Sequence, residues 1–282
     1  MMRVTLVAGL ALSAVSAACA ATDRIELKSS EGTAVVALEG ARVESLVLGG
    51  REVLFRPAAE SLVPGKWTHA GVPVCWPWFG SSGPDPKVKH GFAWKHRFEV
   101  REQDESHVVL GWTAPAGAVP EFPAAFDLEV KITLAEALRV EIRTTNAGTD
   151  EMAFTVGTHP YLAVGDRDRA VVTRTDGLPY CDTRVNRDMS RAWRGDLCVT
   201  SAYDHAFAEV GKASFHELVD ASVGRKIGIS SVGASKLVVW NPGQGKKIKG
   251  LADDDWRKFV CVEPVVCWQE SAIRLVPGKT HV

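Results

Sequence analysis

A histidine and a glutamate in this chain occupy settings that suit acid–base chemistry. His159 lies in the segment Gly157–Tyr161 (GTHPY), at the end of a predicted strand. On a regular strand Ala153, Thr155 and Gly157 share its face, and their small size leaves room for a ligand. Histidine donates or accepts a proton near neutral pH. The alternative is that His159 only hydrogen-bonds at a strand end, and the residues by themselves leave both interpretations open.

Glu263 is the second candidate, because it lies inside an apolar run. In the segment Phe259–Pro264 (FVCVEP) it shares a strand face with Cys261, and the run is typical of a buried strand. Burial of an unpaired carboxyl group raises its pKa toward the range that suits a general base. The alternative is a structural glutamate paired with an arginine, such as Arg257 or Arg274.

Other residue types suggest contacts with a sugar. Trp76 and Trp78 lie close together in one motif, and Trp240 precedes an Asn-Pro pair. Tryptophan faces pack well against the C–H faces of sugars, although core packing is their commoner use. Asp204 could hold sugar hydroxyls or begin a turn. His90 follows a loop rich in proline and glycine.

Signatures of metal and nucleotide binding are missing from the sequence. It contains no Cys-x-x-Cys, no His-Glu-x-x-His and no phosphate-binding glycine loop. His90 and His96 could bind a metal, but nothing beside them completes a site. The sequence thus contains none of the usual motifs for a metal or a nucleotide. The formal net charge of −1 gives no reason to expect nucleic acid or an acidic membrane surface as a partner.

The elements that must position these residues are short strands. Apolar and polar residues alternate in several segments, with turn residues between them, and no segment has a convincing helical stripe. We predict an all-β sandwich or barrel, with one domain over residues 21–282. The predicted strands include 34–38, 98–100, 108–112, 126–134, 138–142, 236–240 and 259–266.

Residues 1–20 have the pattern of a secretory signal peptide. Arg3 precedes an apolar run, Val4–Val15, which is followed by a small-residue cleavage pattern, Ala18–Ala20. This run is too short to span a bilayer comfortably, and no later segment is long enough. We expect a periplasmic or secreted monomer. A lipoprotein acylated at Cys19 is the less favoured alternative.

Export bears on the five cysteines that follow residue 20. Three lie in apolar runs, where cysteine usually behaves as a small hydrophobic residue. Cys181 and Cys198 instead flank a polar, arginine-rich stretch. In an oxidising compartment they are the best candidates for a disulfide bond.

Three groups of motifs together resemble the hexose-6-phosphate mutarotases, a branch of the aldose 1-epimerase superfamily. The resemblance extends from about Ile25 to Pro277 and implies a galactose mutarotase-like β-supersandwich of antiparallel sheets. The motifs are Gly71–Gly80 (GVPVCWPWFG) with His90–Ala93 (HGFA), Thr158–Tyr161 (THPY) with Val164–Asp166 (VGD), and Val239–Pro242 (VWNP) with Phe259–Pro264 (FVCVEP).

The resemblance also implies roles for individual residues. It assigns His159 as general acid and Glu263 as general base, and it places His90 and Asp204 in the substrate pocket. Glu263 would take the proton of the anomeric hydroxyl while His159 protonates the ring oxygen. The ring then opens, the aldehyde turns, and closure gives the other anomer. No cofactor takes part.

Two positions depart from the family pattern. His69 and Ala70 stand where the family usually carries one arginine, and Trp94 stands where it usually carries another; both arginines are associated with the substrate phosphate. Neither histidine nor tryptophan offers the permanent charge and paired hydrogen bonds of arginine. We therefore predict that strong selectivity for a 6-phosphate is lost. Lys87, Lys89 and Lys95 lie nearby and could rebuild a looser anion site that is sensitive to salt.

Two other functions fit part of the pattern. The first is a non-catalytic carbohydrate-binding protein on the same fold, against which the intact His159 and Glu263 argue. The second is a glycan-cleaving enzyme with Glu263 and Asp204 as its carboxylate pair. That function would leave the His159 motif unexplained.

Overall fold

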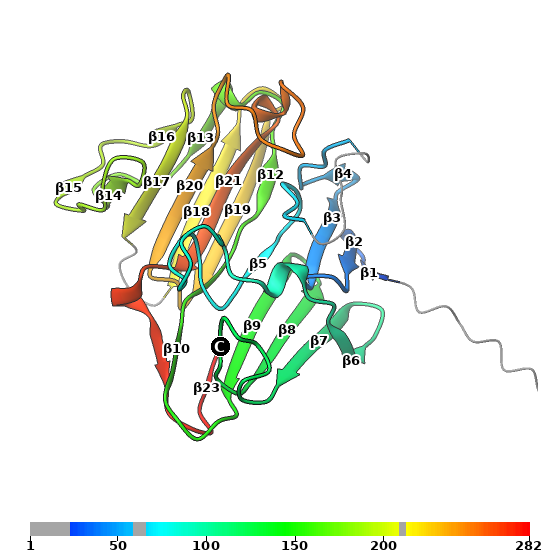
Figure 1. Ribbon diagram of the computed structural model, residues 1–282. Helices are drawn as coiled ribbons and strands as arrows, with labels where there is room; N and C mark the ends of the chain where they lie inside the picture. Colours follow the sequence, from blue (N-terminus) through cyan, green and yellow to red (C-terminus); the bar gives the residue numbers. More distant parts are fainter. Residues whose placement is uncertain (1–22, 59–65, 209–212) are drawn as a thin grey trace, which may run out of the picture.

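The structure is a computed structural model that describes residues 23–58, 66–208 and 213–282. Within these residues the regular structure consists of strands and four short 3-10 helices, as the alternating pattern predicted (Figure 1). The strands form antiparallel sheets. Residues 1–20, the predicted signal peptide, lie outside the described residues. Among the described residues, no helix has the length and apolar character that crossing a membrane requires.

The first half of the chain forms two antiparallel meanders. One contains β1 (Arg24–Ser29), β2 (Gly32–Ala37), β3 (Arg42–Leu48) and β4 (Arg51–Glu52). The other is ordered β23-β9-β8-β7-β6, and its C-terminal strand β23 pairs with β9. Its strands are β6 (Glu99–Gln103), β7 (His107–Ala114), β8 (Phe126–Leu134), β9 (Leu138–Asn146) and β23 (Thr280–His281).

The central sheet holds most of the predicted site residues. Its strands run in the order β15-β14-β17-β20-β21-β11-β5, and β12 also pairs with β21. They are β5 (Val74–Cys75), β11 (Val156–Thr158), β12 (Tyr161–Ala163), β14 (Pro179–Asp182), β15 (Arg191–Ala192), β17 (Tyr203–Ala208), β20 (Lys236–Asn241) and β21 (Phe259–Val266).

Two smaller sheets and four 3-10 helices complete the described structure. One sheet has the order β16-β13-β18-β19, and β10 pairs with β22 in the other. These strands are β10 (Met152–Phe154), β13 (Ala170–Val172), β16 (Leu197–Cys198), β18 (Ala213–Asp220), β19 (Arg225–Val232) and β22 (Ile273–Leu275). The helices are η2 (Ala93–Lys95), η3 (Arg167–Arg169), η4 (Asp255–Arg257) and η5 (Gln269–Ser271).

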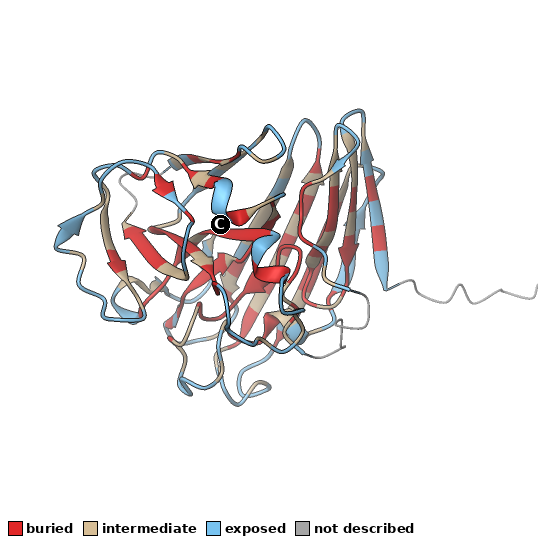
Figure 2. Cartoon of the chain, turned by 90° about the horizontal axis from the view of Figure 1, so that it is seen from above, coloured by how far each residue is buried: buried red, intermediate tan, exposed pale blue. Residues whose placement is uncertain are grey.

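One cluster of buried apolar residues draws on every sheet. In β8 the five apolar residues from Phe126 to Leu134 are buried and the four polar residues between them are only partly buried. This alternation confirms the predicted hairpin of β8 and β9, in which Phe126 lies opposite Asn146. β21 is buried on both faces instead, with only Pro264 partly exposed. Figure 2 shows buried segments along the strands and exposed segments mainly in the outer loops.

Two of the predicted sugar-binding tryptophans belong to this core. Trp76 is fully buried, and its ring centroid lies 4.6 Å from that of Phe126 and 5.2 Å from that of Phe122. Trp78 is 4% exposed, and its indole N–H donates to the backbone oxygen of Val88. Neither lines the cavity described below. The prediction that they bind substrate is therefore wrong, because apolar packing takes up both rings.

The predicted disulfide bond is also wrong. Cys181 lies on β14 and is buried in an apolar cluster with Cys75 and Cys267. Cys198 lies on β16, in a different sheet, and is exposed. Both are free thiols. The polar stretch between them forms separate strands and turns, so closeness in sequence does not bring the two sulfur atoms together.

Alkylation of the native protein should distinguish these two thiols. We expect Cys198 to react in the folded state and Cys181 to react only after unfolding, since Cys181 is fully buried. Mass mapping of non-reduced protein checks this directly. A linked peptide pair containing both cysteines would contradict the structure.

Candidate active site

The register of the central sheet brings His159 and Glu263 together. On one side of His159, β11 pairs with β21 through Gly157 and Val265. On the other side, β12 pairs with the same strand through Tyr161 and Cys261. The short break between β11 and β12 therefore places His159 directly opposite Glu263. Side chains opposite each other on antiparallel strands lie about 5 Å apart at Cβ, within contact distance.

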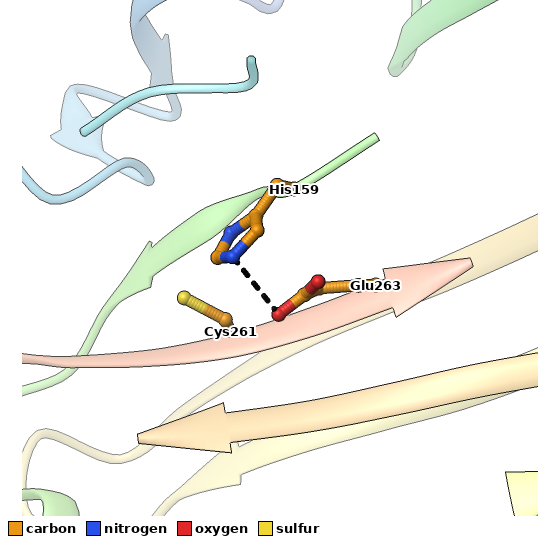
Figure 3. A group of neighbouring side chains, drawn as sticks. All are labelled: His159, Cys261 and Glu263. Carbon is orange, nitrogen blue, oxygen red and sulfur yellow. Dashed lines mark ion pairs between the residues drawn. The ribbon is translucent and has the colours of Figure 1, made fainter. Parts of the chain in front are cut away.

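The pair is close, buried and without other polar partners. His159 Nε2 lies 3.4 Å from Glu263 Oε1, and the two residues are 5% and 1% exposed (Figure 3). Within the described residues, neither Glu263 oxygen nor His159 Nδ1 has a hydrogen-bond partner. Arg257 pairs with Asp168, and Arg274 pairs with Glu151. The alternative of a structural ion pair between Glu263 and one of these arginines is thus not what the structure contains.

Burial shifts both ionisable groups toward their uncharged forms. It raises the pKa of the Glu263 carboxyl well above its ordinary value, and the charge of Asp204 raises it further. It lowers the pKa of the His159 imidazole well below its ordinary value, with smaller contributions from His90 and His69. The buried pair therefore favours a protonated carboxyl group beside a neutral imidazole. Transfer of the carboxyl proton from Glu263 to His159 gives a carboxylate base beside an imidazolium acid.

A cavity of about 650 Å³ opens above this pair. Two rows of side chains cross the sheet and form its floor, because β17, β20 and β21 are paired in register. One row contains Glu263, Val238 and Ala206, and the other contains Trp240 and Asp204. Loops supply the walls. The lining residues from loops include Trp67, His69, Phe79, Lys87, Lys89, His90, Arg187, Lys246 and Trp268, and η2 adds Trp94.

His90 is held as a neutral hydrogen-bond donor. Its Nδ1 accepts the backbone N–H of Gly80 at 3.3 Å, so the ring proton must be on Nε2. Burial lowers its pKa to about 3, which keeps the ring uncharged at neutral pH. Its backbone is left-handed, with φ of 61°, and its ring stacks on Trp67 at 4.7 Å. Such strain in a non-glycine residue is common at functional sites.

His69 is neutral for a similar reason. The Tyr161 hydroxyl accepts the indole N–H of Trp67 at 3.2 Å and lies 3.0 Å from His69 Nδ1. The hydroxyl can donate its proton to Nδ1 or accept the Nδ1–H, according to the tautomer of His69. Burial lowers the pKa of His69 to about 4. A position that carries a phosphate-associated arginine in the resembled family is thus occupied by an uncharged ring.

The structure gathers most of the predicted site residues around one cavity. His69, His90, Trp94, Asp204 and Trp240 line it together with His159 and Glu263. Lys95 does not. It ends η2, its side chain is exposed, and it is absent from the cavity wall, so the prediction that Lys95 binds substrate is wrong. Lys95 follows Trp94 in this short helix, so the two side chains point in different directions.

Several lining residues were not predicted. Tyr161 belongs to the motif of His159, and its ring stacks on the imidazole at 4.8 Å. Trp67 lies two residues before His69, and that spacing could have pointed to it. Trp268 follows β21 in a left-handed conformation, with φ of 70°. Arg187 and Lys246 come from loops that have no sequence motif, so only the fold brings them to the cavity.

A model of the family described as aldose 1-epimerase matches residues 23–282. The chain belongs to the aldose 1-epimerase family. The resemblance seen in its motifs is thereby confirmed, and so is its assignment to the isomerases.

Curated relatives of this aldose 1-epimerase family member are similar to it over most of its length. A protein of Salmonella typhimurium named putative glucose-6-phosphate 1-epimerase is 26% identical over 252 residues, which covers 86% of this chain and 83% of its own. One of Cenchrus ciliaris with the same name is 24% identical over 282 residues, covering 90% and 84%.

Solved structures confirm the predicted fold class. A putative mutarotase (YeaD) from Salmonella typhimurium superimposes with a TM-score of 0.75 at 24% identity, covering 89% of this chain and 87% of that one. The Slr1438 protein from Synechocystis gives a TM-score of 0.77 at 20% identity, covering 100% and 96%. The antiparallel sheets of this epimerase family member thus form a galactose mutarotase-like fold.

Proposed function

We propose that this isomerase is an exported mutarotase that interconverts the anomers of free aldoses and has no dedicated site for a 6-phosphate. The observation that supports acid–base catalysis is the His159–Glu263 pair. Its two groups lie 3.4 Å apart, are buried, and have polar atoms without hydrogen-bond partners in the described structure. Unpaired buried polar atoms are costly, and a bound sugar would satisfy them.

The proposed reaction needs one acid and one base on the same side of the sugar. Glu263 removes the proton of the anomeric hydroxyl while His159 protonates the ring oxygen, and the bond between the anomeric carbon and the ring oxygen breaks. The aldehyde turns about its bond to the next carbon. Closure reverses both proton transfers and gives the other anomer. A pair that shares one proton suits this cycle, because the roles exchange at each half-reaction.

The cavity wall supports recognition of a neutral sugar. Trp240 and Trp67 line the cavity and bring aromatic surface to the C–H groups of a sugar ring. Asp204 accepts hydrogen bonds from hydroxyls, and the Nε2–H of His90 donates one. These four groups surround the acid–base pair, which fits a ring held with its anomeric carbon between His159 and Glu263.

Charge at the mouth of the cavity is diffuse rather than fixed. Lys87, Lys89, Arg187 and Lys246, the cationic rim, all line the cavity and are all exposed. No ion pair joins them to an acid within the described residues. Exposed cations attract an anion weakly and in a manner that salt screens. The rim supports a mild, salt-sensitive preference for charged sugars.

Kinetics with neutral and phosphorylated sugars test the proposed substrate range. We expect turnover of glucose or galactose, and less than a tenfold advantage in kcat/KM for glucose 6-phosphate at moderate salt, because the cations of the rim, Arg187 included, are exposed and screened by salt. Tenfold corresponds to about 1.4 kcal/mol of transition-state binding. NMR of anomer exchange at low and moderate salt measures both values.

Trp94→Arg provides the matched variant for this test. It returns a guanidinium to the cavity wall and should increase the relative kcat/KM for the phosphate more than that for the neutral sugar. A wild-type preference for the phosphate of tenfold or more that persists at moderate salt would show that a dedicated phosphate site exists.

Export is the second part of the proposal. It rests on the charged, apolar and small-residue pattern of residues 1–20. Cell fractionation of a C-terminally tagged protein should place the shortened chain outside the cytoplasm. A variant that lacks residues 2–20 should remain inside. Full-length chain recovered only from the cytoplasm would refute export.

A further inference from the structure

Three atoms that could bind a metal meet at the base of the cavity, and one of them takes no part in the proposed reaction. His159 Nε2, Cys261 Sγ and a carboxylate oxygen of Glu263 all lie within 4.8 Å of one another (Figure 3). Cys261 precedes Glu263 by two residues on β21, so both side chains project from the same face of the strand. All three residues are buried, and both Glu263 oxygens lack hydrogen-bond partners among the described residues.

The distances and the donor types suit zinc. Zinc bonds of about 2.0 Å to nitrogen and oxygen in tetrahedral geometry place those two atoms about 3.3 Å apart. The observed separation of His159 Nε2 and Glu263 Oε1 is 3.4 Å. The longer zinc–sulfur bond requires Cys261 Sγ to approach by on the order of 1 Å at most. Imidazole, thiolate and carboxylate together favour zinc over the hard cations magnesium and calcium.

We propose that His159, Cys261 and Glu263 form a binding site for Zn²⁺ or another thiophilic divalent cation, and that its occupation reversibly inhibits mutarotation. Coordination uses the lone pairs of His159 and Glu263 that must exchange protons with the sugar. The thiol proton of Cys261 and the proton held by the His159–Glu263 pair both pass to solvent as the metal binds. The inhibitory consequence rests on the proposed acid–base function, whereas the binding itself does not.

The surroundings identify such a metal as an exchangeable inhibitor rather than a resident cofactor. Histidines that hold a permanent metal usually donate their second ring N–H to an acceptor that fixes the ring. His159 Nδ1 has no partner among the described residues. Cys261 packs in an apolar cluster with Phe55, Tyr161 and Phe259 instead of lining the cavity. A chelator should therefore remove the metal easily.

Inhibition assays on the purified full-length enzyme test the proposal. We expect ZnCl₂ to suppress anomer exchange, EDTA to restore it, and equimolar MgCl₂ to have no effect. Cys261→Ala and Cys261→Ser should keep zinc-free activity close to wild type. Each should raise the half-inhibitory zinc concentration about tenfold or more, because even the loss of a supporting partner weakens metal sites by that factor. Cys181→Ala, a buried cysteine outside the cavity, is the matched control and should respond as wild type.

A spectroscopic measurement gives a readout that does not depend on activity. Addition of CoCl₂ to metal-free protein should produce a thiolate-to-cobalt charge-transfer band in wild type and Cys181→Ala, and none in either Cys261 variant. Equal zinc inhibition of wild type and both Cys261 variants, or a cobalt spectrum without the thiolate band, would overturn the proposal. If the zinc-free wild type shows no mutarotase activity, the proposed function fails, and the cobalt spectrum still decides the metal site.

Discussion

Glu263→Gln and His159→Asn are each expected to lower kcat by roughly 10²-fold or more, the usual scale for loss of a positioned proton donor or acceptor. Each change keeps the side chain close to its original shape but removes its ability to exchange a proton. The two residues lie opposite each other across β11, β12 and β21, with their polar atoms 3.4 Å apart. Anomer exchange measured by NMR on purified variants checks this. Near-wild-type turnover in either variant would exclude the mechanism.

Glu263→Gln should also show that the buried carboxyl group of Glu263 destabilises the fold when it is ionised. Burial raises the pKa of Glu263 in the folded protein. The contribution of Glu263 to the free energy of unfolding is therefore favourable below its ordinary pKa of 4.5, and it is lost as the pH rises toward the folded-state pKa. The glutamine that replaces it does not titrate. The melting temperature of Glu263→Gln, relative to wild type, should therefore increase from mildly acidic to mildly alkaline pH. A difference that stays constant or reverses with pH would argue against a buried, unpaired carboxyl group.

Trp76→Ala should destabilise the protein by about 3–5 kcal/mol, the usual cost of truncating a large buried aromatic residue. The ring is fully buried and contacts Phe126, Phe122 and Phe92. Trp76→Phe should cost much less, because it keeps an aromatic ring and removes an indole N–H that has no partner within the described residues. Denaturant unfolding measures both changes.

Trp240 is the matched contrast to Trp76. It lines the cavity and is only partly buried. Trp240→Ala should therefore raise KM more than Trp76→Phe does, while it lowers the free energy of unfolding less than Trp76→Ala does. If Trp76→Phe raised KM and left stability unchanged, Trp76 would have to be reassigned to the sugar site.

The sequence by itself determined the class of the fold, and its family motifs pointed to His159 and Glu263 as the predicted acid–base pair. Alternation with a period of two depends only on local side-chain direction, so β8 could be predicted residue by residue. The family was evident because its motifs hold residue types, such as a glutamate inside an apolar run, that ordinary packing does not favour. Burial of Glu263 followed from its neighbours along the chain.

Only the tertiary structure decided which residues share the cavity. Whether an aromatic side chain faces core or ligand depends on which strand lies beside it, and local sequence does not carry that information. Trp76 and Trp78 therefore enter the core, whereas Trp67 and Trp268 reach the cavity. The separation of Cys181 from Cys198 has the same cause: strand pairing between distant segments sends β14 and β16 into different sheets. The contact of His159 with Glu263 likewise exists because two short strands on either side of one proline pair with β21 in a single register.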